Sequence, residues 1–182
     1  IETAVRHGAK FNSLILVGAT PCFVEKKDFP WGQPRALVKR MVLDMKKDPA
    51  AALQRFYALN FTEEELSTEG AKGFIERYRY PGPVNCSADQ PGCFPIFRYG
   101  EITAALEALY NSDIRANLAK INLPALVIHG EKDNVCPVKA GMYLASNLKN
   151  ARLKVFKNSG HAPFITRPGE FHKAVKEFLS SL

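Results

Sequence analysis

Short apolar runs alternate with amphipathic segments along this chain, and their order predicts the architecture. "FNSLILVGA" at 11–19 and "PALVIHG" at 124–130 are runs of β-compatible residues closed by small ones, as is typical of strands buried on both faces. "ARLKVFKNSG" at 151–160 alternates more and predicts a third strand. Helical periodicity at 137–150 separates the last two strands, and an amphipathic helix is expected at 168–182. This order predicts an α/β fold with three parallel strands and right-handed crossovers.

The periodicity of these two helices also indicates which side chains face the sheet. An amphipathic helix gathers its apolar residues on one face at spacings of three and four. The residues expected to face the core are Val138, Met142, Leu148, Phe171, Val175 and Phe178.

Residues 24 to 111 have a different pattern. Helical periodicity recurs in four segments without a comparable strand between them, at 34–47, 49–59, 62–79 and 100–111. A helical insertion between two strands of a parallel sheet usually covers the carboxyl-terminal edge of the sheet, where such folds place their sites. We therefore divide the chain into a first core segment (1–23), a helical cap or lid (24–111) and the C-terminal part of the core (112–182).

The cap is rich in aromatic side chains and also carries a turn-rich loop, "YPGPVNCSADQPGCFP", at 80–95. Ordinary packing inside the cap accounts for most of its aromatic residues. Four of them are candidates for lining an apolar substrate channel: Phe29, Trp31, Phe56 and Phe97.

Composition limits the class of protein. The chain has 182 residues, of which 46% are hydrophobic and 24% charged, so it can fill one sizeable core and is not disordered or fibrous. No apolar run approaches the roughly 20 residues that span a membrane, and no signal-peptide pattern begins the chain. The four cysteines lack C-x-x-C spacing, although Cys86 and Cys93 could close a small loop if oxidised. We expect a soluble, cytoplasmic protein with reduced thiols and no membrane partner.

The net charge of +7 is unevenly distributed. Residues 24–60 hold eight Lys and Arg against four Asp and Glu, a net charge of +4. A solvated helix face would explain this excess. The sharper interpretation is that Arg35, Lys39 and Arg40 attract an acidic partner protein. Nucleic acid is a weak candidate, because no recognised binding module accompanies the charge.

Two residues carry candidate chemistry. Asp133 follows the second strand in "HGEKDNVCP", and His161 follows the third strand in "NSGHAPF". Their separation of 28 residues matches one strand-helix-strand excursion, so adjacent strands would bring the two loops together. A carboxylate beside an imidazole fixes the tautomer of the ring and leaves its other nitrogen free to act as a base.

Each of the two residues has a plainer interpretation when taken singly. A loop Asp is commonly a turn residue, and a His after a strand is commonly structural. The other histidines are poorer candidates, since His129 lies at a buried strand end. Because His129, Cys136 and His161 have no recognised ligand spacing, we expect neither a metal site nor a cofactor.

Five stretches together resemble the C-terminal two thirds of an α/β-hydrolase. The chain is similar, within that superfamily, to the carboxylesterases that hydrolyse the methyl ester of pimeloyl-acyl carrier protein in biotin synthesis. The residues that carry the resemblance are "LILVGATPCF" at 14–23, "DFPWGQP" at 28–34, "RFYALN" at 55–60, "HGEKDNVCP" at 129–137 and "HAPFITRPGEF" at 161–171. The stretch at 80–99 matches nothing in that family.

The resemblance implies that Asp133 and His161 belong to a Ser-His-Asp triad. In this superfamily the serine lies on a G-x-S-x-G turn that precedes both partners, and the sequence contains no G-x-S-x-G. "IETAVRHGAK" at 1–10 resembles the end of the helix that follows such a turn. We therefore expect a chain that lacks its nucleophile, is inactive alone, and covers the exposed edge of its first strand by dimerising or exchanging an element.

Two alternatives to a carboxylesterase remain at this stage. The triad does not choose the substrate, so another α/β-hydrolase activity, such as C–C bond hydrolysis or cofactor-free haloperoxidase chemistry, fits as well. A non-catalytic interaction protein that keeps the cap is the second alternative.

Overall fold

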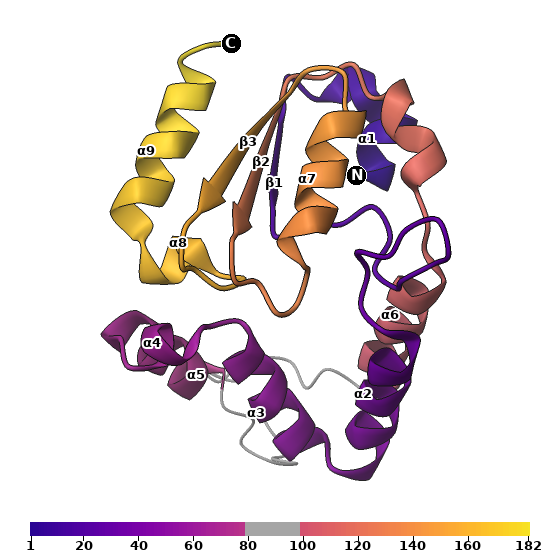
Figure 1. Cartoon of the computed structure of the whole chain (residues 1–182), viewed down its shortest axis with the longest axis vertical. Coiled ribbons are helices and arrows are strands. Elements are labelled where there is room, and N and C mark those ends of the chain that lie inside the picture. The colour runs from indigo at the N-terminus through magenta and orange to yellow at the C-terminus, as the bar shows by residue number, and fades with distance from the viewer. Residues whose placement is uncertain (79–98) are drawn as a thin grey trace, which may run out of the picture.

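A computed structural model describes residues 1–78 and 99–182 of the chain. It contains a parallel sheet of three strands in the order β1 (Leu14–Val17), β2 (Ala125–Gly130) and β3 (Ala151–Phe156) (Figure 1). The predicted α/β class and the parallel strands are confirmed. Strands β1 and β3 end earlier than expected, because the backbone turns to positive φ at Gly18 and at Asn158, one and two residues after the strands end.

The two faces of the sheet pack against different helices, α7 (Val138–Asn147) and α9 (Pro168–Leu179) (Figure 1). Strand β2 is buried at every position and alternates between the two faces, as expected for a middle strand. Its residues Ala125 and Val127 join the cluster of α7, whereas Leu126 and Ile128 join that of α9. The prediction that β1 is buried on both faces is wrong, since β1 is only partly buried and Ile15 is 37% exposed.

The sheet-facing stripe of α7 differs from the predicted one. Of the three predicted positions, Leu148 is buried, Val138 is partly buried and Met142 is exposed. Within the helix the buried positions are Ala140, Gly141 and Leu144. A Cβ atom on Gly141 would lie 2.3 Å from Nδ1 of His129, so the helix approaches β2 too closely for a large side chain. In α9 the prediction is confirmed: Phe171, Val175 and Phe178 pack against the sheet.

Short elements complete the core. Helix η2 (Arg115–Lys120) packs beside α7, and α1 (Glu2–His7) packs beside η2, so that both extend the cluster of α7. The short η1 (Gly8–Lys10) follows α1, and α8 (Pro163–Thr166) precedes α9. No helix in the described ranges is long and apolar enough to cross a membrane.

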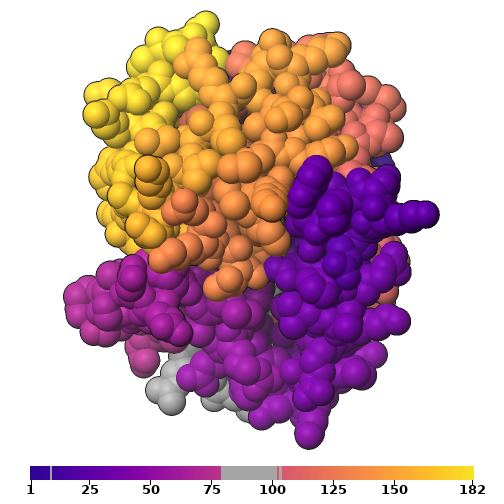
Figure 2. All heavy atoms as spheres, in the orientation of Figure 1, coloured from indigo at the N-terminus to yellow at the C-terminus, as the bar shows by residue number. Residues whose placement is uncertain are grey.

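The helices inserted between β1 and β2 lie at the carboxyl-terminal ends of the strands (Figure 1), and we call this group the cap. Figure 2 shows it directly against the core. The cap consists of α2 (Arg35–Lys47), α3 (Pro49–Leu59), α4 (Glu63–Leu66), α5 (Glu69–Arg77) and α6 (Tyr99–Asn111).

The single helix expected at 62–79 is in fact two, α4 and α5. Thr68 accepts a hydrogen bond from the backbone N–H of Ala71 and so starts a new helix at Glu69. The whole turn-rich loop at 80–95, with Cys86 and Cys93, lies outside the described residues.

Candidate active site

Asp133 lies on the loop after β2 and is held there by the backbone. Its Oδ1 accepts hydrogen bonds from the N–H groups of Val135 and Cys136, both at 2.8 Å. The side chain is fully buried. The loop itself therefore fixes the direction of the other carboxylate oxygen.

That second oxygen meets the loop after β3. Oδ2 of Asp133 lies 2.8 Å from Nδ1 of His161. The imidazole is 23% exposed, and its Nε2 has no hydrogen-bond partner among the described residues. The structure thus brings the two residues singled out in the sequence into direct contact.

The charge on Asp133 sets the chemistry of this pair. Burial by itself would raise the pKa of its carboxyl, but hydrogen bonds from His129 and His161 outweigh burial and hold the pKa below its ordinary value. The group is therefore a carboxylate at neutral pH. A carboxylate at Nδ1 requires a proton on that nitrogen, which leaves the Nε2 lone pair of His161 free to accept a proton.

His129 is a second imidazole on the same carboxylate. It is fully buried, and its Nε2 lies 2.6 Å from the carbonyl oxygen of Cys136 and 3.2 Å from Oδ2 of Asp133. Because a carbonyl only accepts, Nε2 carries the proton and can also donate to the carboxylate. Nδ1 has no hydrogen-bond partner in the described part of the chain. The sequence placed His129 at a buried strand end but did not show that it contacts Asp133.

Gly18, at the end of β1, lies under the imidazole of His161. A Cβ atom built there would lie 2.5 Å from Cε1 and 2.7 Å from Nδ1 of the ring. The residue also has a φ of 55°, a conformation that glycine adopts without strain. Both constraints require glycine at this position, and the sequence signal for it was a single Gly closing a strand.

Glu65, at the end of α4, is a buried carboxylate on the other side of the His161 loop. Its oxygens accept hydrogen bonds from Ser159 Oγ at 2.6 Å and from the N–H of Gly160 at 2.8 Å. The pattern T-x-x-E at 62–65, a capping box, was the available signal. It indicates a helix start, not a contact with the core.

An apolar pocket of about 680 Å³ lies between cap helices α2, α3 and α6. It reaches Asn134, the neighbour of Asp133, and Phe61, whose neighbour Asn60 accepts a hydrogen bond from the N–H of His161 at 2.8 Å. The pocket therefore reaches the loop of Asp133, and on the cap side it reaches the residue next to the one that binds the loop of His161. Its apolar side chains include Leu37, Met41, Met45, Leu53, Phe56, Leu59, Phe61, Leu66, Ile102, Leu106 and Leu109.

The four aromatic candidates for a substrate channel are not gathered together. Phe56 lines the pocket. Phe29 and Trp31 instead pack edge-on against each other and contact Tyr143 of α7, with ring centroids 5.1 and 5.5 Å from that of the tyrosine. Phe97 lies outside the described residues.

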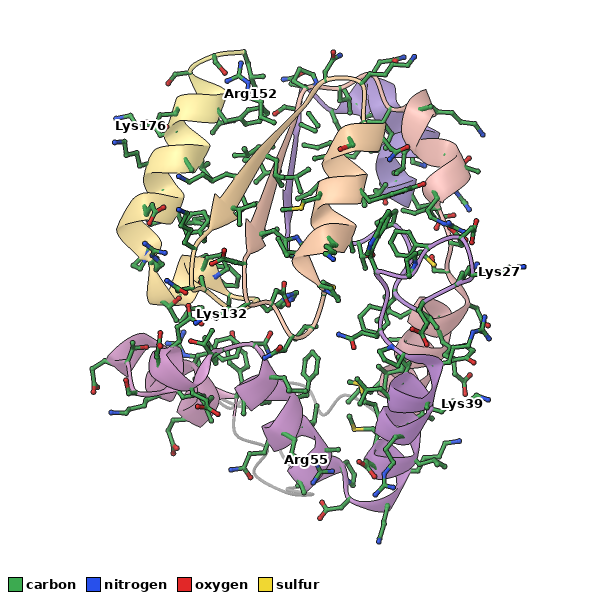
Figure 3. The ribbon with its side chains drawn as sticks, viewed as in Figure 1. Lys27, Lys39, Arg55, Lys132, Arg152 and Lys176 are labelled. Atoms are coloured by element: carbon green, nitrogen blue, oxygen red, sulfur yellow. The ribbon has the colours of Figure 1, made fainter. Side chains whose placement is uncertain are left out.

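The three candidate docking residues are exposed on α2. Arg35 contacts the hydroxyl and ring of Tyr110, and Arg40 forms an ion pair with Asp44 at 2.8 Å. Lys39 points outward from α2 (Figure 3) and forms no ion pair with any residue that the structure describes.

No serine hydroxyl among the described residues forms a hydrogen bond with His161. Ser159 is buried and donates its hydrogen bond to Glu65. No three His, Cys, Asp or Glu side chains in 1–78 and 99–182 gather as metal ligands would. Burial, together with the charge of Asp133, raises the pKa of Cys136 to about 12, so that its sulfur remains a protonated thiol.

Comparison with known proteins gives consistent results. The sequence model described as the alpha/beta hydrolase fold matches residues 3–168. A pimeloyl-acyl-carrier-protein methyl ester esterase of Aromatoleum aromaticum is 34% identical over 92% of this chain and 64% of its own length. An esterase with the same name from Nitrosomonas europaea is 30% identical over 94% of this chain and 63% of its own length.

Solved structures with a similar fold include an esterase and a lactonase. The esterase EaEST of Exiguobacterium antarcticum superposes with a TM-score of 0.78 at 27% identity, covering 98% of this chain and 61% of that one. An enol-lactonase of Burkholderia xenovorans LB400 superposes with a TM-score of 0.75 at 20% identity over 98% of this chain and 60% of that one, a likeness of fold alone. The chain thus spans less than two thirds of the length of these proteins.

Proposed function

The chain belongs to the alpha/beta hydrolase fold family, and we propose that it is the C-terminal portion of a serine carboxylesterase that hydrolyses the methyl ester of an acyl chain. The observation that carries this proposal is the Asp133–His161 contact of 2.8 Å with Nε2 of the ring left free. The relatives named as methyl ester esterases support the choice of substrate class.

In the proposed mechanism His161 acts first as a base and then as an acid. Nε2 takes the proton of a serine hydroxyl while the serine oxygen attacks the ester carbonyl. The imidazolium, stabilised by Asp133, then protonates the departing methoxide, which leaves as methanol, and the acyl group remains on the serine as an acyl-enzyme. Water, deprotonated by the same nitrogen, attacks the acyl-enzyme and releases the acid and the serine.

We propose that the serine and the oxyanion-hole N–H groups lie in a part of the protein that precedes residue 1. The absence of G-x-S-x-G from residues 1–182 supports this. Residues 1–182 alone should therefore hydrolyse a short p-nitrophenyl ester no faster than buffer, whereas the full-length protein should turn it over. Turnover by the 182-residue chain at the full-length rate would reject the proposed triad.

The same arrangement suggests how the sheet continues. β1 has β2 on one side and no described strand on the other. We infer that strands of the preceding part pair with β1 in the whole protein. The 182-residue chain alone should then dimerise or exchange an element through this edge, and a strictly monomeric species in analytical ultracentrifugation would contradict the inference.

The pocket and the basic face of α2 suggest the acyl group and its carrier. An apolar pocket that reaches the loop of Asp133 suits an acyl chain, and exposed Arg35, Lys39 and Arg40 suit docking of an acidic carrier protein. Neutralising these three residues should lower kcat/KM for a carrier-linked methyl ester far more than for a small ester.

The matched control for this experiment neutralises three exposed lysines of the core, Lys139, Lys149 and Lys176, which changes the net charge equally. Lys176 lies on α9, across the molecule from α2 (Figure 3). Equal losses on both substrates, or the same loss in the control, would reject docking at α2.

A further inference from the structure

Glu65 of the cap accepts four hydrogen bonds with its carboxylate, and three of them come from residues of the core. Oε1 accepts from Ser159 Oγ at 2.6 Å and from Thr166 Oγ1 at 2.7 Å. Oε2 accepts from the backbone N–H of Gly160 at 2.8 Å and of Thr62 at 3.0 Å. Glu65 is only 8% exposed and Ser159 is fully buried, so these bonds are shielded from solvent.

A role as a helix cap accounts for only one of the four bonds. In a capping box the Glu side chain returns to the N–H of the first cap residue, here Thr62. Helix α4 needs nothing more from this carboxylate. The remaining three donors belong to the loop after β3 and to α8, and two of them lie on the residues just before His161.

The cap backbone holds the same loop at a second point. The N–H of His161 donates to the carbonyl oxygen of Asn60 at 2.8 Å. A Cβ atom on Gly160 would lie 2.6 Å from that oxygen and 3.0 Å from Oε2 of Glu65. Cap and loop are therefore in contact so close that only glycine fits between them.

The opposite side of the His161 loop is hydrogen-bonded to the loop that carries Asp133. The N–H of Lys132, next to Asp133, donates to the carbonyl oxygen of Ser159 at 2.9 Å. The loop that carries His161 thus lies between the loop of Asp133 and the cap. On the cap side, Glu65 supplies most of the side-chain hydrogen bonds.

We propose that Glu65 is a positioning residue that ties the cap to the loop before His161 and thereby holds the imidazole within hydrogen-bonding reach of Asp133. The catalytic meaning of this position rests on the proposed function, in which His161 is the base. Glu65 itself contacts no reacting atom and acts through the loop. It follows that a displacement of the cap also displaces the base.

The ionisation of Glu65 supports this role. Burial by itself would raise the pKa of the carboxyl, but the hydrogen bonds from Ser159, Thr62, Thr166 and Gly160 outweigh burial and hold its pKa below the ordinary value. The acceptor is therefore charged at neutral pH, and charge-assisted hydrogen bonds are about twice as strong as neutral ones.

Three substitutions in the full-length protein test the proposal. Glu65→Ala removes all four bonds. Glu65→Gln preserves most of them, because its amide oxygen can accept the two backbone N–H groups while its NH₂ donates to hydroxyl oxygens that can rotate. Thr62→Ala is the matched control: it removes the other half of the capping box but leaves all four donors to Glu65 in place.

The readouts are the imidazole NMR signals of His161, which need no ester hydrolysis, and kcat and KM for a p-nitrophenyl ester. For Glu65→Ala we expect the Nδ1–H signal to broaden and kcat to fall by up to about 100-fold with KM little changed, because a misplacement near 1 Å costs about that much. Glu65→Gln should largely restore both readouts, and Thr62→Ala should leave both as in the unmodified protein.

Each outcome decides the matter. If Glu65→Ala loses stability to the same extent as Thr62→Ala and keeps the His161 signal and kcat, Glu65 is a helix cap only and the proposal is overturned. If Glu65→Ala does not fold, the test passes to Ser159→Ala, which removes one hydrogen bond between Glu65 and the loop. This variant should shift the His161 NMR signal by a smaller amount, and an unchanged signal overturns the proposal. If the unmodified protein hydrolyses no ester, the proposed function fails, while the NMR comparison still decides whether Glu65 positions the ring.

Discussion

Replacing Gly18 with alanine should displace the imidazole of His161, the proposed base, and leave the rest of the fold in place. The new Cβ atom would lie 2.5 Å from Cε1 of His161, whereas ordinary contact begins at 3.4 Å, so one group must move by about 0.9 Å. Strand β1 resists this movement, because the N–H of Gly18 donates to Ile128 at 2.9 Å. The loop of His161 is also held, by Asn60 and Glu65. The ring itself is therefore the part that shifts, away from its 2.8 Å bond with Asp133.

The size of the effect follows from this displacement. A misplacement near 1 Å costs about 100-fold in rate, which corresponds to about 2.7 kcal/mol in the activation barrier. The positive φ of Gly18 adds a separate cost of about 1 to 2 kcal/mol to the free energy of folding, because alanine disfavours that conformation. Kinetics on a p-nitrophenyl ester with the full-length protein and urea unfolding measure the two costs independently.

Two further variants separate the two causes. Gly18→Asn keeps the clashing Cβ atom but tolerates positive φ better, so it should lose as much activity as alanine and less stability. Gly169→Ala, on α9, is the control, because a Cβ atom there meets nothing within 4 Å. If Gly18→Ala keeps the kcat of the unmodified protein and an unchanged His161 NMR signal, the argument that Gly18 makes room for the base is refuted.

Three other predictions follow from the site. Asp133→Asn should lower kcat by about 10⁴-fold with little change in KM, because an uncharged amide does not fix the tautomer of His161 as the carboxylate does. A near-normal kcat in steady-state kinetics would contradict the role proposed for Asp133. The folded-state pKa values of Asp133 and Glu65 lie below their ordinary values of 3.8 and 4.5, so the stability they contribute is complete above those values and is lost as pH falls through the lower folded values. The urea concentration at the midpoint of unfolding should therefore decrease as the pH falls below about 4.5, and Glu65→Gln should weaken this dependence on pH. The same pH dependence in both proteins would count against a stabilising charge on Glu65. Cys136, with its pKa raised to about 12, should resist alkylation at pH 8 until the protein is unfolded, and peptide mapping that finds it labelled in the native state would disprove its burial as a thiol.

Hydrophobic periodicity by itself determined the order and type of most elements. The three strands, the helices of the cap, and the two helices that cover the sheet were all predictable, because period-2 and period-3.6 patterns record which side of an element is buried. The pattern did not resolve the break between α4 and α5, which depends on the cap at Thr68. The hydrophobic pattern also wrongly predicted that Met142 faces the sheet. Helix α7 approaches His129 so closely that only small residues fit there, and small residues contribute little to hydrophobic periodicity.

The contact between Asp133 and His161, the proposed acid and base, was predictable from sequence, whereas the groups that hold the two residues were not. Asp133 and His161 each follow a strand, and neighbouring parallel strands end at the same edge, so their proximity follows from topology. Gly18, His129 and Glu65 lie up to 143 positions from His161 along the chain, and nothing in their own segments points to it. The roles of Gly18 and Glu65 arise from close approaches between distant segments, whereas His129 lies 3.2 Å from Asp133 at a separation of only four positions. Such contacts depend on how the cap, β1 and α7 pack against the two loops, and only the tertiary structure specifies that packing.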